Sequence, residues 1–269
     1  MNFAGIDIGS RTIELVVVNE AGEMIDCFQA DTGFDPAVSA ERLINEADYD
    51  YIMATGYGRN LFEVNFDSPT VTEIKAHATG ARSFFPKAGT VLDIGGQDSK
   101  AISMLENGRV RKFEMNDRCA AGTGKFLEIM AGTLGFDIDE FGNEALLAEN
   151  NVSISSMCTV FAESEVTSLI AKGRDRREIA KGLHVSVIKR VAGMVNRISS
   201  NGEIVFTGGV AKNPCMRDLL EKKLSRKVLI PDDPQSVGAL GAALLIREEM
   251  LKQSRQPSAR QINQLMADS

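Results

Sequence analysis

The stretch FAGIDIGS at residues 3–10 recurs in the middle of the chain as TVLDIGG at residues 90–96. In both copies, an apolar run typical of a buried strand ends in aspartate, isoleucine and glycine. Each copy continues into a second strand-like run, a turn and a third run, over residues 12–29 and 100–115. This repeated order predicts a duplicated α/β fold, in which each half begins with an antiparallel meander.

The turn that closes the first strand of each copy is suited to a polyphosphate ligand. Its glycines let the backbone approach phosphate oxygens closely and direct N–H groups at them. We expect Asp7 and Asp93 to face each other across a cleft between the halves and to hold a hydrated Mg²⁺. One Asp-Xaa-Gly turn is weak evidence, but two in matching positions predict a nucleotide site. The predicted contacts are Gly9, Ser10, Arg11, Thr12, Gly95 and Gly96, with Gln97 and Asp98 as residues that would orient the attacking water.

Two later segments complete this nucleotide pattern. A strand at residues 204–206 leads into TGGVAKN at residues 207–213, and glycines between a strand and a helix start suit nucleotide contact. A small-residue helix that opens at residues 234–243 leaves Gly238 and Gly241 open to two interpretations, close helix packing or nucleotide contact. The predicted contacts on this side are Gly208 and Gly209 beside the adenosine, with Val210, Asn213, Gln235 and Gly238 as further candidates.

The rest of the chain is largely helical in its pattern. Apolar periodicity predicts helices at residues 36–47, 72–85, 120–134, 139–149, 159–172 and 176–197. We expect two lobes, residues 1–90 with about 236–269 and residues 91–235. Each would carry a mixed five-stranded sheet flanked by helices, with the nucleotide cleft between the lobes. The polar segment after Lys252 is predicted to be a loose extension.

Composition limits the class of protein. The chain has 269 residues, 43% of them hydrophobic, and a net charge of −7, so it can bury a large core and has no basic nucleic-acid footprint. No apolar run approaches the length of a membrane span, and the first residues form a strand pattern rather than a signal peptide. The four cysteines lack a framework spacing, which favours a reducing compartment. We therefore expect a cytoplasmic protein without nucleic-acid or membrane partners.

Two cysteines lie in unusual settings, Cys119 in NDRCAAGTGKF and Cys158 in SSMCTVFAESEV, each where a loop is predicted to enter a helix. A helix N-terminus stabilises negative charge, which suits a thiolate ligand. An iron–sulfur cubane takes four thiolates, so a two-fold dimer could supply two from each chain. From the cysteines alone, apolar packing, a zinc site and a disulfide stay open. Packing fits Cys27 and Cys215 well.

A few other residues have competing interpretations. His77 and His184 fall inside helical patterns and are interpreted as packing or surface residues. Glu163 and Glu165 are favourable acids near a helix start or contacts to a partner. The loop TGYGR at residues 55–59 carries an aromatic that no turn requires, so a role in relaying the nucleotide state or docking a partner stays open.

Together these segments resemble the actin-like, ribonuclease H-like ATPase superfamily, which includes sugar kinases and Hsp70-type chaperones. The strings ATGYGRN, DIGGQDSK and the two cysteine strings are similar to activators of 2-hydroxyacyl-CoA dehydratases and to ATP-binding subunits of benzoyl-CoA reductases, over about residues 4–245. The resemblance implies a homodimer with one [4Fe–4S] cluster, ligated by Cys119 and Cys158 of each subunit. It also implies ATP hydrolysis to ADP that drives a low-potential electron, taken from ferredoxin or flavodoxin, onto a partner iron–sulfur dehydratase or reductase.

The first phosphate turn departs from the pattern of similar activators, in which small hydroxylated residues and a lysine follow. Here Ile13 and Glu14 follow, and Glu14 has the wrong sign for phosphate. Either Glu14 points elsewhere along the strand, or the nucleotide is held differently. Two other functions stay open, a small-molecule (sugar or acid) kinase with Asp93 as base and a sensor that binds ATP without turnover. The sequence identifies neither the electron acceptor nor the reductant.

Overall fold

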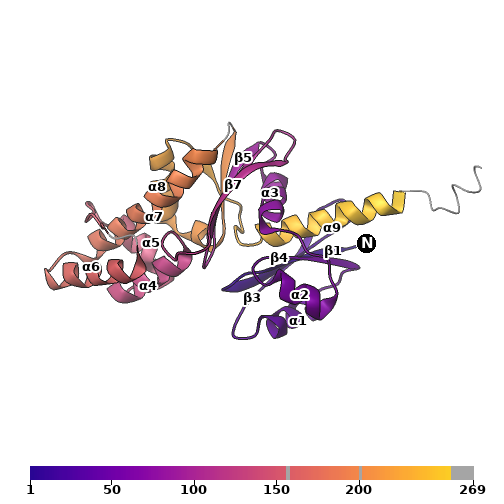
Figure 1. The fold of residues 1–269 in the computed structure, drawn as a ribbon, viewed down its shortest axis with the longest axis horizontal. Helices are drawn as coiled ribbons and strands as arrows, with labels where there is room; N and C mark the ends of the chain where they lie inside the picture. Colours follow the sequence, from indigo (N-terminus) through magenta and orange to yellow (C-terminus); the bar gives the residue numbers. More distant parts are fainter. Residues whose placement is uncertain (156–157, 200–201, 256–269) are drawn as a thin grey trace, which may run out of the picture.

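The computed structural model describes residues 1–155, 158–199 and 202–255, and the strands of this part of the chain form two mixed sheets. Figure 1 shows both sheets with their helices. The first has the order β3-β2-β1-β4 and comprises β1 (Phe3–Ile8), β2 (Thr12–Val18), β3 (Met24–Asp31) and β4 (Tyr51–Thr55). The second has the order β7-β6-β5-β8-β9 and comprises β5 (Ala88–Ile94), β6 (Ser99–Met104), β7 (Val110–Asn116), β8 (Glu203–Thr207) and β9 (Val228–Leu229).

The two sheets repeat one topology. β1 pairs antiparallel with β2 and parallel with β4, while β5 pairs antiparallel with β6 and parallel with β8. β3 and β7 complete the two antiparallel meanders. The central strands are buried on both faces, which explains why β1 and β5 are continuous apolar runs. The predicted duplication and its opening meanders are confirmed.

The first sheet differs from the expected five strands. Within the described residues it has four, and the place of a fifth is taken by a single parallel bridge between Ala54 and Thr70. Ala54 donates to the Pro69 carbonyl at 2.9 Å and accepts from the Val71 N–H at 2.8 Å. Proline has no N–H for a ladder, and a helix begins at Glu73, so this segment is too short to become a strand.

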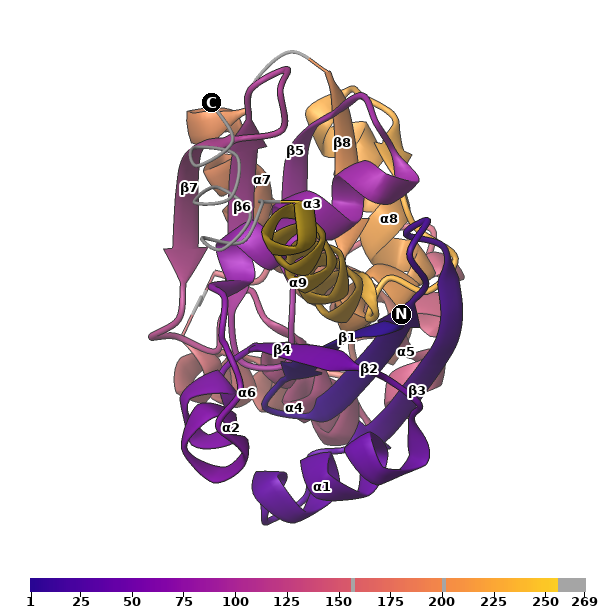
Figure 2. The same cartoon turned by 90° about the vertical axis from the view of Figure 1, so that its right-hand side faces the viewer.

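Helices α3 (Glu73–Phe84) and α9 (Val237–Arg255) lie between the two sheets (Figure 2). α9 packs on the first sheet through its alanine-rich face, and α3 packs on the second sheet through Ala78 and Ala81. Glycines let the two helices touch, because a Cβ on Gly80 would lie 2.0 Å from the Val237 carbonyl oxygen. A Cβ on Gly241 would lie 1.8 Å from the Ala76 carbonyl oxygen. Gly241 therefore serves helix packing.

The opposite face of the first sheet is covered by α1 (Pro36–Glu46) and α2 (Arg59–Phe66). Ile6 and Leu15 of the sheet pack there with Leu43 of α1 and Phe62 of α2. The sequence patterns predict α1 but not α2. Phe62 is the one residue of α2 that is buried, and the helix has only 8 residues, so it is too short for a clear helical pattern in the sequence.

Most helices of the second half gather at one end of the molecule, with α6 at the far end (Figure 1). They pack with the second sheet into one large core. They are α4 (Gly124–Leu134), α5 (Ile138–Leu146), α6 (Thr159–Ala171), α7 (Arg176–Ile198) and α8 (Pro214–Leu224), with the short 3₁₀ helix η1 (Gly209–Lys212) before α8.

The helix expected from residue 120 begins later, at Gly124. Residues 120–123 form a tight turn instead, in which the Thr123 hydroxyl donates to the Ala120 carbonyl at 2.6 Å and Gly122 has φ +92°. The other predicted helices agree within a few residues. Across the described ranges, no helix is both long enough and apolar enough to cross a bilayer. Most of the segment predicted to be a loose extension, residues 256–269, lies outside those ranges.

Candidate functional site

The structure brings Asp7 and Asp93 together. Each is the last residue but one of its strand, and their strand neighbours are Glu14 and Thr55 for Asp7, and Lys100 and Thr207 for Asp93. Both carboxylates are buried, and the His77 ring of α3 lies between them. His77 Nε2 is 3.7 Å from Asp7 Oδ2, and Nδ1 is 3.5 Å from Asp93 Oδ1.

The two carboxyl groups differ in their electrostatics. Burial raises the pKa of Asp7 to about 8, although His77 partly offsets this rise. Burial would raise the pKa of Asp93 too, but His77, Lys100 and the hydrogen bond from Thr207 outweigh it and hold that pKa below its usual value. Thr207 Oγ1 donates to Asp93 Oδ1 at 2.9 Å. Without a cation, Asp93 is therefore the charged member of the pair at neutral pH, and Asp7 is largely protonated.

Lys100 joins three carboxylates beside this pair. Its Nζ lies 2.6 Å from Glu73, 2.7 Å from Asp98 and 3.3 Å from Asp93. Burial alone would lower the pKa of Lys100, but the three carboxylates raise it above its usual value. Glu73 belongs to α3 and also faces Arg59 of the glycine loop at 3.8 Å. The Lys100 ammonium group thus connects α3, through Glu73, with the second phosphate turn, through Asp98.

Two buried polar atoms near Asp7 and Asp93 have no hydrogen-bond partner among the described residues. They are Thr55 Oγ1 and His77 Nδ1. Buried polar groups are almost always paired, so unpaired ones beside two carboxylates indicate space for an ordered water or a hydrated cation. Oxygen donors of this kind suit Mg²⁺, which keeps several of its waters.

The two phosphate turns are closed by equivalent backbone hydrogen bonds and lie against each other. Gly9 N donates to the Thr12 carbonyl and Gly95 N to the Asp98 carbonyl, each at 3.0 Å. A Cβ on Gly96 would lie 3.2 Å from Ser10 Oγ. The structure therefore brings together the predicted phosphate contacts at residues 9–12 and 95–98.

Glu14 lies beside the first phosphate turn and is linked to Thr12 through Gln235. Its Oε1 accepts from Gln29 Nε2 at 3.1 Å and from Gln235 Nε2 at 3.3 Å, and Gln235 also donates to Thr12 Oγ1 at 3.2 Å. The carboxyl group is buried, and burial raises its pKa to about 7. Glu14 is thus held among two of the predicted nucleotide contacts, Thr12 and Gln235, and the two interpretations of its role stay predictions.

The predicted residues on the adenosine side separate into two groups. Gly208, Gly209 and Gln235 lie next to the phosphate turns, since a Cβ on Gly208 would lie 2.9 Å from Asp93 Oδ1 and one on Gly209 would lie 3.8 Å from Gln235. Val210 is buried at the start of η1. Asn213 instead caps α8, accepting from Met216 N at 3.1 Å, and its Nδ2 lies 3.0 Å from His184 Nε2.

Gly238 on α9 borders the first aspartate. A Cβ at this position would lie 1.9 Å from Asp7 Oδ2, a distance that real Cβ atoms do not adopt. Of the two interpretations left open for Gly238, neither matches fully, because the residue makes room for a carboxylate rather than for a helix or a nucleotide.

Cys119 lies in the turn before α4, and Cys158 is the N-cap residue of α6. Asn116 Nδ2 donates to the Cys119 carbonyl at 2.9 Å and to the Ala121 carbonyl at 3.0 Å, and Arg190 of α7 donates to Asn116 Oδ1 at 3.1 Å. Cys119 is half-buried and Cys158 exposed, so both thiols are open to ligands. Residues 156–157, just before Cys158, lie outside the described ranges.

The turn that carries Cys119 is joined directly to the second phosphate turn. Gly124 N donates to the Gly95 carbonyl at 2.9 Å, and Lys125 N donates to the Gly96 carbonyl at 2.8 Å. The N-terminus of α4 thus rests on the backbone expected to contact phosphate. A salt bridge of 3.4 Å from Arg11 to Glu128 of α4 makes a second connection, this time from the first phosphate turn.

Two thiols in one chain are too few for a cubane. In the part of the chain that the structure describes, no group of three or more histidine, cysteine or acidic side chains is arranged to hold a metal ion. Two accessible thiols, one in the turn before α4 and one at the N-cap of α6, fit a cluster only if a second chain provides the others. The donor set therefore fits a cluster shared between two copies.

Sequence patterns missed three residues of the site: Glu73, His77 and Lys100. Glu73 and His77 are four residues apart on α3, so they share one face of an otherwise small-residue helix. Lys100 occupies a fully buried strand, where a lysine needs a charged partner. A polar stripe on α3 and a lysine inside an apolar strand are the signals that could have identified them.

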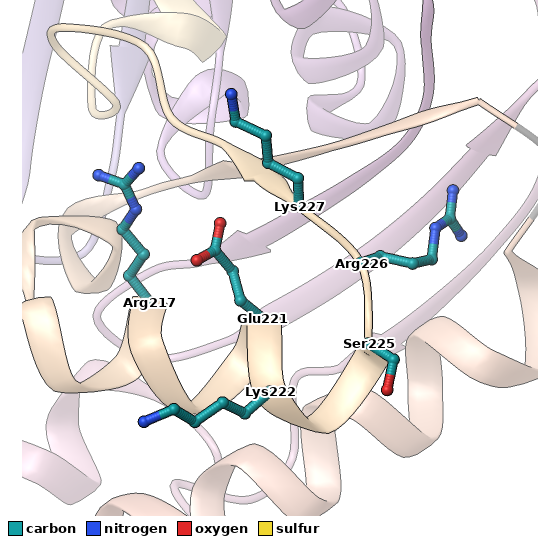
Figure 3. A pocket seen from close by; sticks show the side chains of 6 residues that line it. All are labelled: Arg217, Glu221, Lys222, Ser225, Arg226 and Lys227. Carbon is teal, nitrogen blue, oxygen red and sulfur yellow. The ribbon is translucent and has the colours of Figure 1, made fainter.

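A separate surface hollow of about 540 Å³ lies where α8 runs into β9 (Figure 3). Three of its charged groups have partners outside the lining. Glu221 accepts from Val228 N at 3.0 Å, and Arg226 donates to Ser199 Oγ at 2.9 Å. Lys222 donates to Asp218 Oδ2 at 2.8 Å. None of the predicted site residues lines this hollow. Its lining residues are Arg217, Glu221, Lys222, Ser225, Arg226 and Lys227.

Comparison with known proteins places this geometry among ATPases. Residues 4–245 match the sequence profile of the BadF/BadG/BcrA/BcrD ATPase family. The 2-hydroxyisocaproyl-CoA dehydratase activator of Clostridioides difficile is 38% identical over 257 residues, which cover 91% of this chain and 94% of that protein.

Two solved structures have the same fold. Component A of the (R)-2-hydroxyglutaryl-CoA dehydratase of Acidaminococcus fermentans superposes with a TM-score of 0.86 at 39% identity, covering 93% of this chain and 99% of that one. The activator of the Clostridium difficile 2-hydroxyisocaproyl-CoA dehydratase with bound ADPNP gives 0.85 at 36% identity, covering 96% and 100%. The predicted actin-like α/β fold is confirmed, apart from the strand number of the first sheet.

Proposed function

The chain belongs to the BadF/BadG/BcrA/BcrD ATPase family, and from this premise we propose that it is an ATP-hydrolysing iron–sulfur activator. It would transfer a low-potential electron to a partner iron–sulfur enzyme, such as a 2-hydroxyacyl-CoA dehydratase or a related reductase. The observation that carries this proposal is the pair of backbone hydrogen bonds between the second phosphate turn and the start of α4, which begins five residues after Cys119.

The nucleotide would lie between the two phosphate turns. Gly9, Ser10, Arg11, Thr12, Gly95 and Gly96 would contact its phosphates, and Gly208, Gly209, Val210 and Gln235 its adenosine. Asp7 and Asp93 would hold hydrated Mg²⁺, which neutralises phosphate charge when bound. Gln97 and Asp98 would orient the attacking water. Asn213 and Gly238 would act indirectly, through the α8 cap and the space beside Asp7.

Cys119 and Cys158 of two identical chains would ligate one [4Fe–4S] cluster on the two-fold axis of a homodimer. The accessibility of both thiols and the position of Cys158 at the N-cap of α6 support this arrangement. In each cycle a ferredoxin or flavodoxin would give the cluster one electron. The partner's iron–sulfur centre would take that electron, and the cluster would return to its oxidised state while ATP is hydrolysed to ADP and phosphate.

Movement of the two lobes would couple ATP to the cluster. Residues 1–90 with 236–269 would form one lobe and residues 91–235 the other. Closure on ATP would move Gly95 and Gly96, and with them the start of α4 to which they are bonded. The exposure of a cluster and the hydrogen bonds to its sulfurs set its reduction potential, so this displacement would change the potential. The free cysteines favour a reducing location, and we place the protein in the cytoplasm.

The proposal is tested with variants that affect cluster binding and ATP hydrolysis separately. Protein purified without oxygen should contain iron and absorb in the blue. Cys119→Ser and Cys158→Ser should lose both signals, while Cys27→Ser, at an exposed cysteine far from α4 and α6 in sequence, should keep them. Asp93→Asn should keep the iron and lose ATP turnover. Iron retained by both site variants would refute the ligand assignment.

The kinase alternative makes the opposite prediction. A sugar or acid kinase on this scaffold would transfer phosphate to a small molecule and would not need either cysteine. The 38% identical relative is named as an activator, which favours the electron-transfer function. ATP turnover that rises in the presence of the partner enzyme would also exclude a sensor that binds ATP without hydrolysing it.

A further inference from the structure

His77 is the group that joins the two halves of the hydrolytic site. Its helix, α3, packs on the second sheet, while its ring reaches Asp7 at the end of β1 in the first sheet. One ring nitrogen faces each aspartate, at 3.7 and 3.5 Å, and the side chain is only 6% exposed. These distances are slightly too long for hydrogen bonds, so the ring lies between the carboxylates without closing on either.

The position of the ring is fixed by the packing of two helices. Gly80 and Gly241 hold α3 and α9 in backbone contact, so α3 cannot slide along α9. A Cβ on Gly238 of α9 would lie 1.9 Å from Asp7 Oδ2 and 3.0 Å from His77 Nε2. The helix backbone thus closes the remaining side of the Asp7–His77 contact. One turn before His77, Glu73 is held by Lys100, which fixes the start of the same helix.

The unpaired Nδ1 indicates that this ring has a further partner in the working site. Among the described residues Nδ1 makes no hydrogen bond, and Thr55 Oγ1 near Asp7 is also unpaired. Asp93 Oδ1, the atom that Nδ1 faces, already accepts from Thr207. A water beside the ring would pair with Nδ1 at the ends of β1 and β5, from which the two phosphate turns begin.

We propose that His77 is a positioning residue of the ATPase site, which fixes the separation of Asp7 and Asp93 across the lobes and orients the attacking water. This inference rests on the proposed function, because it assumes that ATP is hydrolysed between the two turns. It differs from the packing or surface role that the helical pattern predicts for His77. Its role is local to the chemistry and does not involve the cluster.

Three substitutions of His77 distinguish the contributions of its two ring nitrogens to the rate of ATP hydrolysis. His77→Asn keeps an amide nitrogen near the place of Nδ1, His77→Gln keeps one near Nε2, and His77→Ala removes both. Because small displacements of reacting groups cost about 100-fold in rate, His77→Ala should lower kcat by about this factor with little change in KM for ATP. His77→Asn, which preserves the contact to Asp93 and the water, should recover more of the rate than His77→Gln.

The controls distinguish positioning from folding. Lys75→Ala, at an exposed site on the same helix, should leave kcat, KM and melting temperature unchanged. Iron content should stay at the wild-type level in all His77 variants, and added imidazole should restore part of the kcat of His77→Ala. An unchanged kcat in His77→Ala would overturn the inference, as would a loss of activity that follows the melting temperature and is not rescued by imidazole. Absence of ATPase activity in the wild-type protein would instead refute the proposed function.

Discussion

The carboxyl groups of Glu14 and of its strand neighbour Asp7 are both buried. Burial of Glu14 makes the free energy of unfolding depend on pH. Burial raises its pKa from the usual 4.5 to about 7, so the folded chain keeps a proton that the unfolded chain releases. Stability therefore falls as the pH rises from about 4.5 to about 7, because the unfolded state gains from ionisation first. The loss is at most about 3 kcal/mol.

Glu14→Gln should remove this pH dependence. The amide cannot ionise, and its oxygen can still accept from Gln29. Below pH 4.5 the variant and the wild type should have similar free energies of unfolding, whereas above pH 7 the variant should be more stable by up to about 3 kcal/mol. Urea unfolding between pH 4 and pH 8, without nucleotide or Mg²⁺, measures the difference.

The matched control is Glu46→Gln, at the exposed end of α1. It should change the free energy of unfolding by a similar small amount at every pH. A constant difference between Glu14→Gln and the wild type over the whole range would contradict the burial argument.

Sequence predicted the two aspartates of the site but not the residues around them. Asp7 and Asp93 stand in a repeated motif, so comparing the two copies was enough to find them. The shared face of Glu73 and His77 on α3 and the place of Lys100 in an apolar strand mark these residues as unusual, but their roles follow only from partners on other elements of the fold. The sequence of α3 alone does not distinguish a histidine between two carboxylates from one that fills a core.

At the scale of elements, the proposed coupling of ATP to the cluster can be tested at the contact between α4 and the second phosphate turn. A Cβ on Gly124 would lie 3.0 Å from the Gly95 carbonyl oxygen and 3.3 Å from a methyl group of Val210. Gly124→Ala should push the helix away from the turn, at a cost of about 1–3 kcal/mol in stability. ATP hydrolysis and iron binding should largely remain, because neither Asp93 nor Cys119 is changed.

What Gly124→Ala should lose is the response of the cluster to ATP. In the wild type, ATP should change the rate at which a chelator removes the iron, and in the variant that change should be much smaller. Gly132→Ala, on the same helix with no atom within 4 Å of the added Cβ, is the control and should respond like the wild type. A full response in Gly124→Ala would mean that coupling runs through another contact, such as Arg11 with Glu128.

Long helices were predictable, whereas a short helix and boundaries set by local hydrogen bonds were not. α7 buries a long face and was predicted almost to its ends. α2 buries only Phe62 and was missed, while the start of α4 was misplaced because residues 120–123 close a turn on the Ala120 carbonyl. Among residues 1–155, 158–199 and 202–255 the first sheet lacks its expected fifth strand for a similar local reason, the proline at residue 69.

At the scale of the whole molecule, the proposed cluster makes the dimer depend on iron. Cys158 begins α6, whose first turn exposes Val160 at 67% and Phe161 at 66%, an apolar surface too small to hold two chains together by itself. Four thiolate bonds to one cluster would supply the missing attachment. We therefore expect a dimer of the 29.2 kDa chain when iron is bound, and dissociation when a chelator removes it.

Light scattering under anaerobic conditions, with iron determined in the same fractions, measures this dependence. Cys158→Ser should behave as a monomer without iron, because each chain would then offer a single site thiol. Cys27→Ser should stay dimeric and keep its iron, since Cys27 lies on β3 of the first sheet. A monomer that retains iron would contradict the shared cluster, because the described part of one chain offers no set of ligands that could hold it alone.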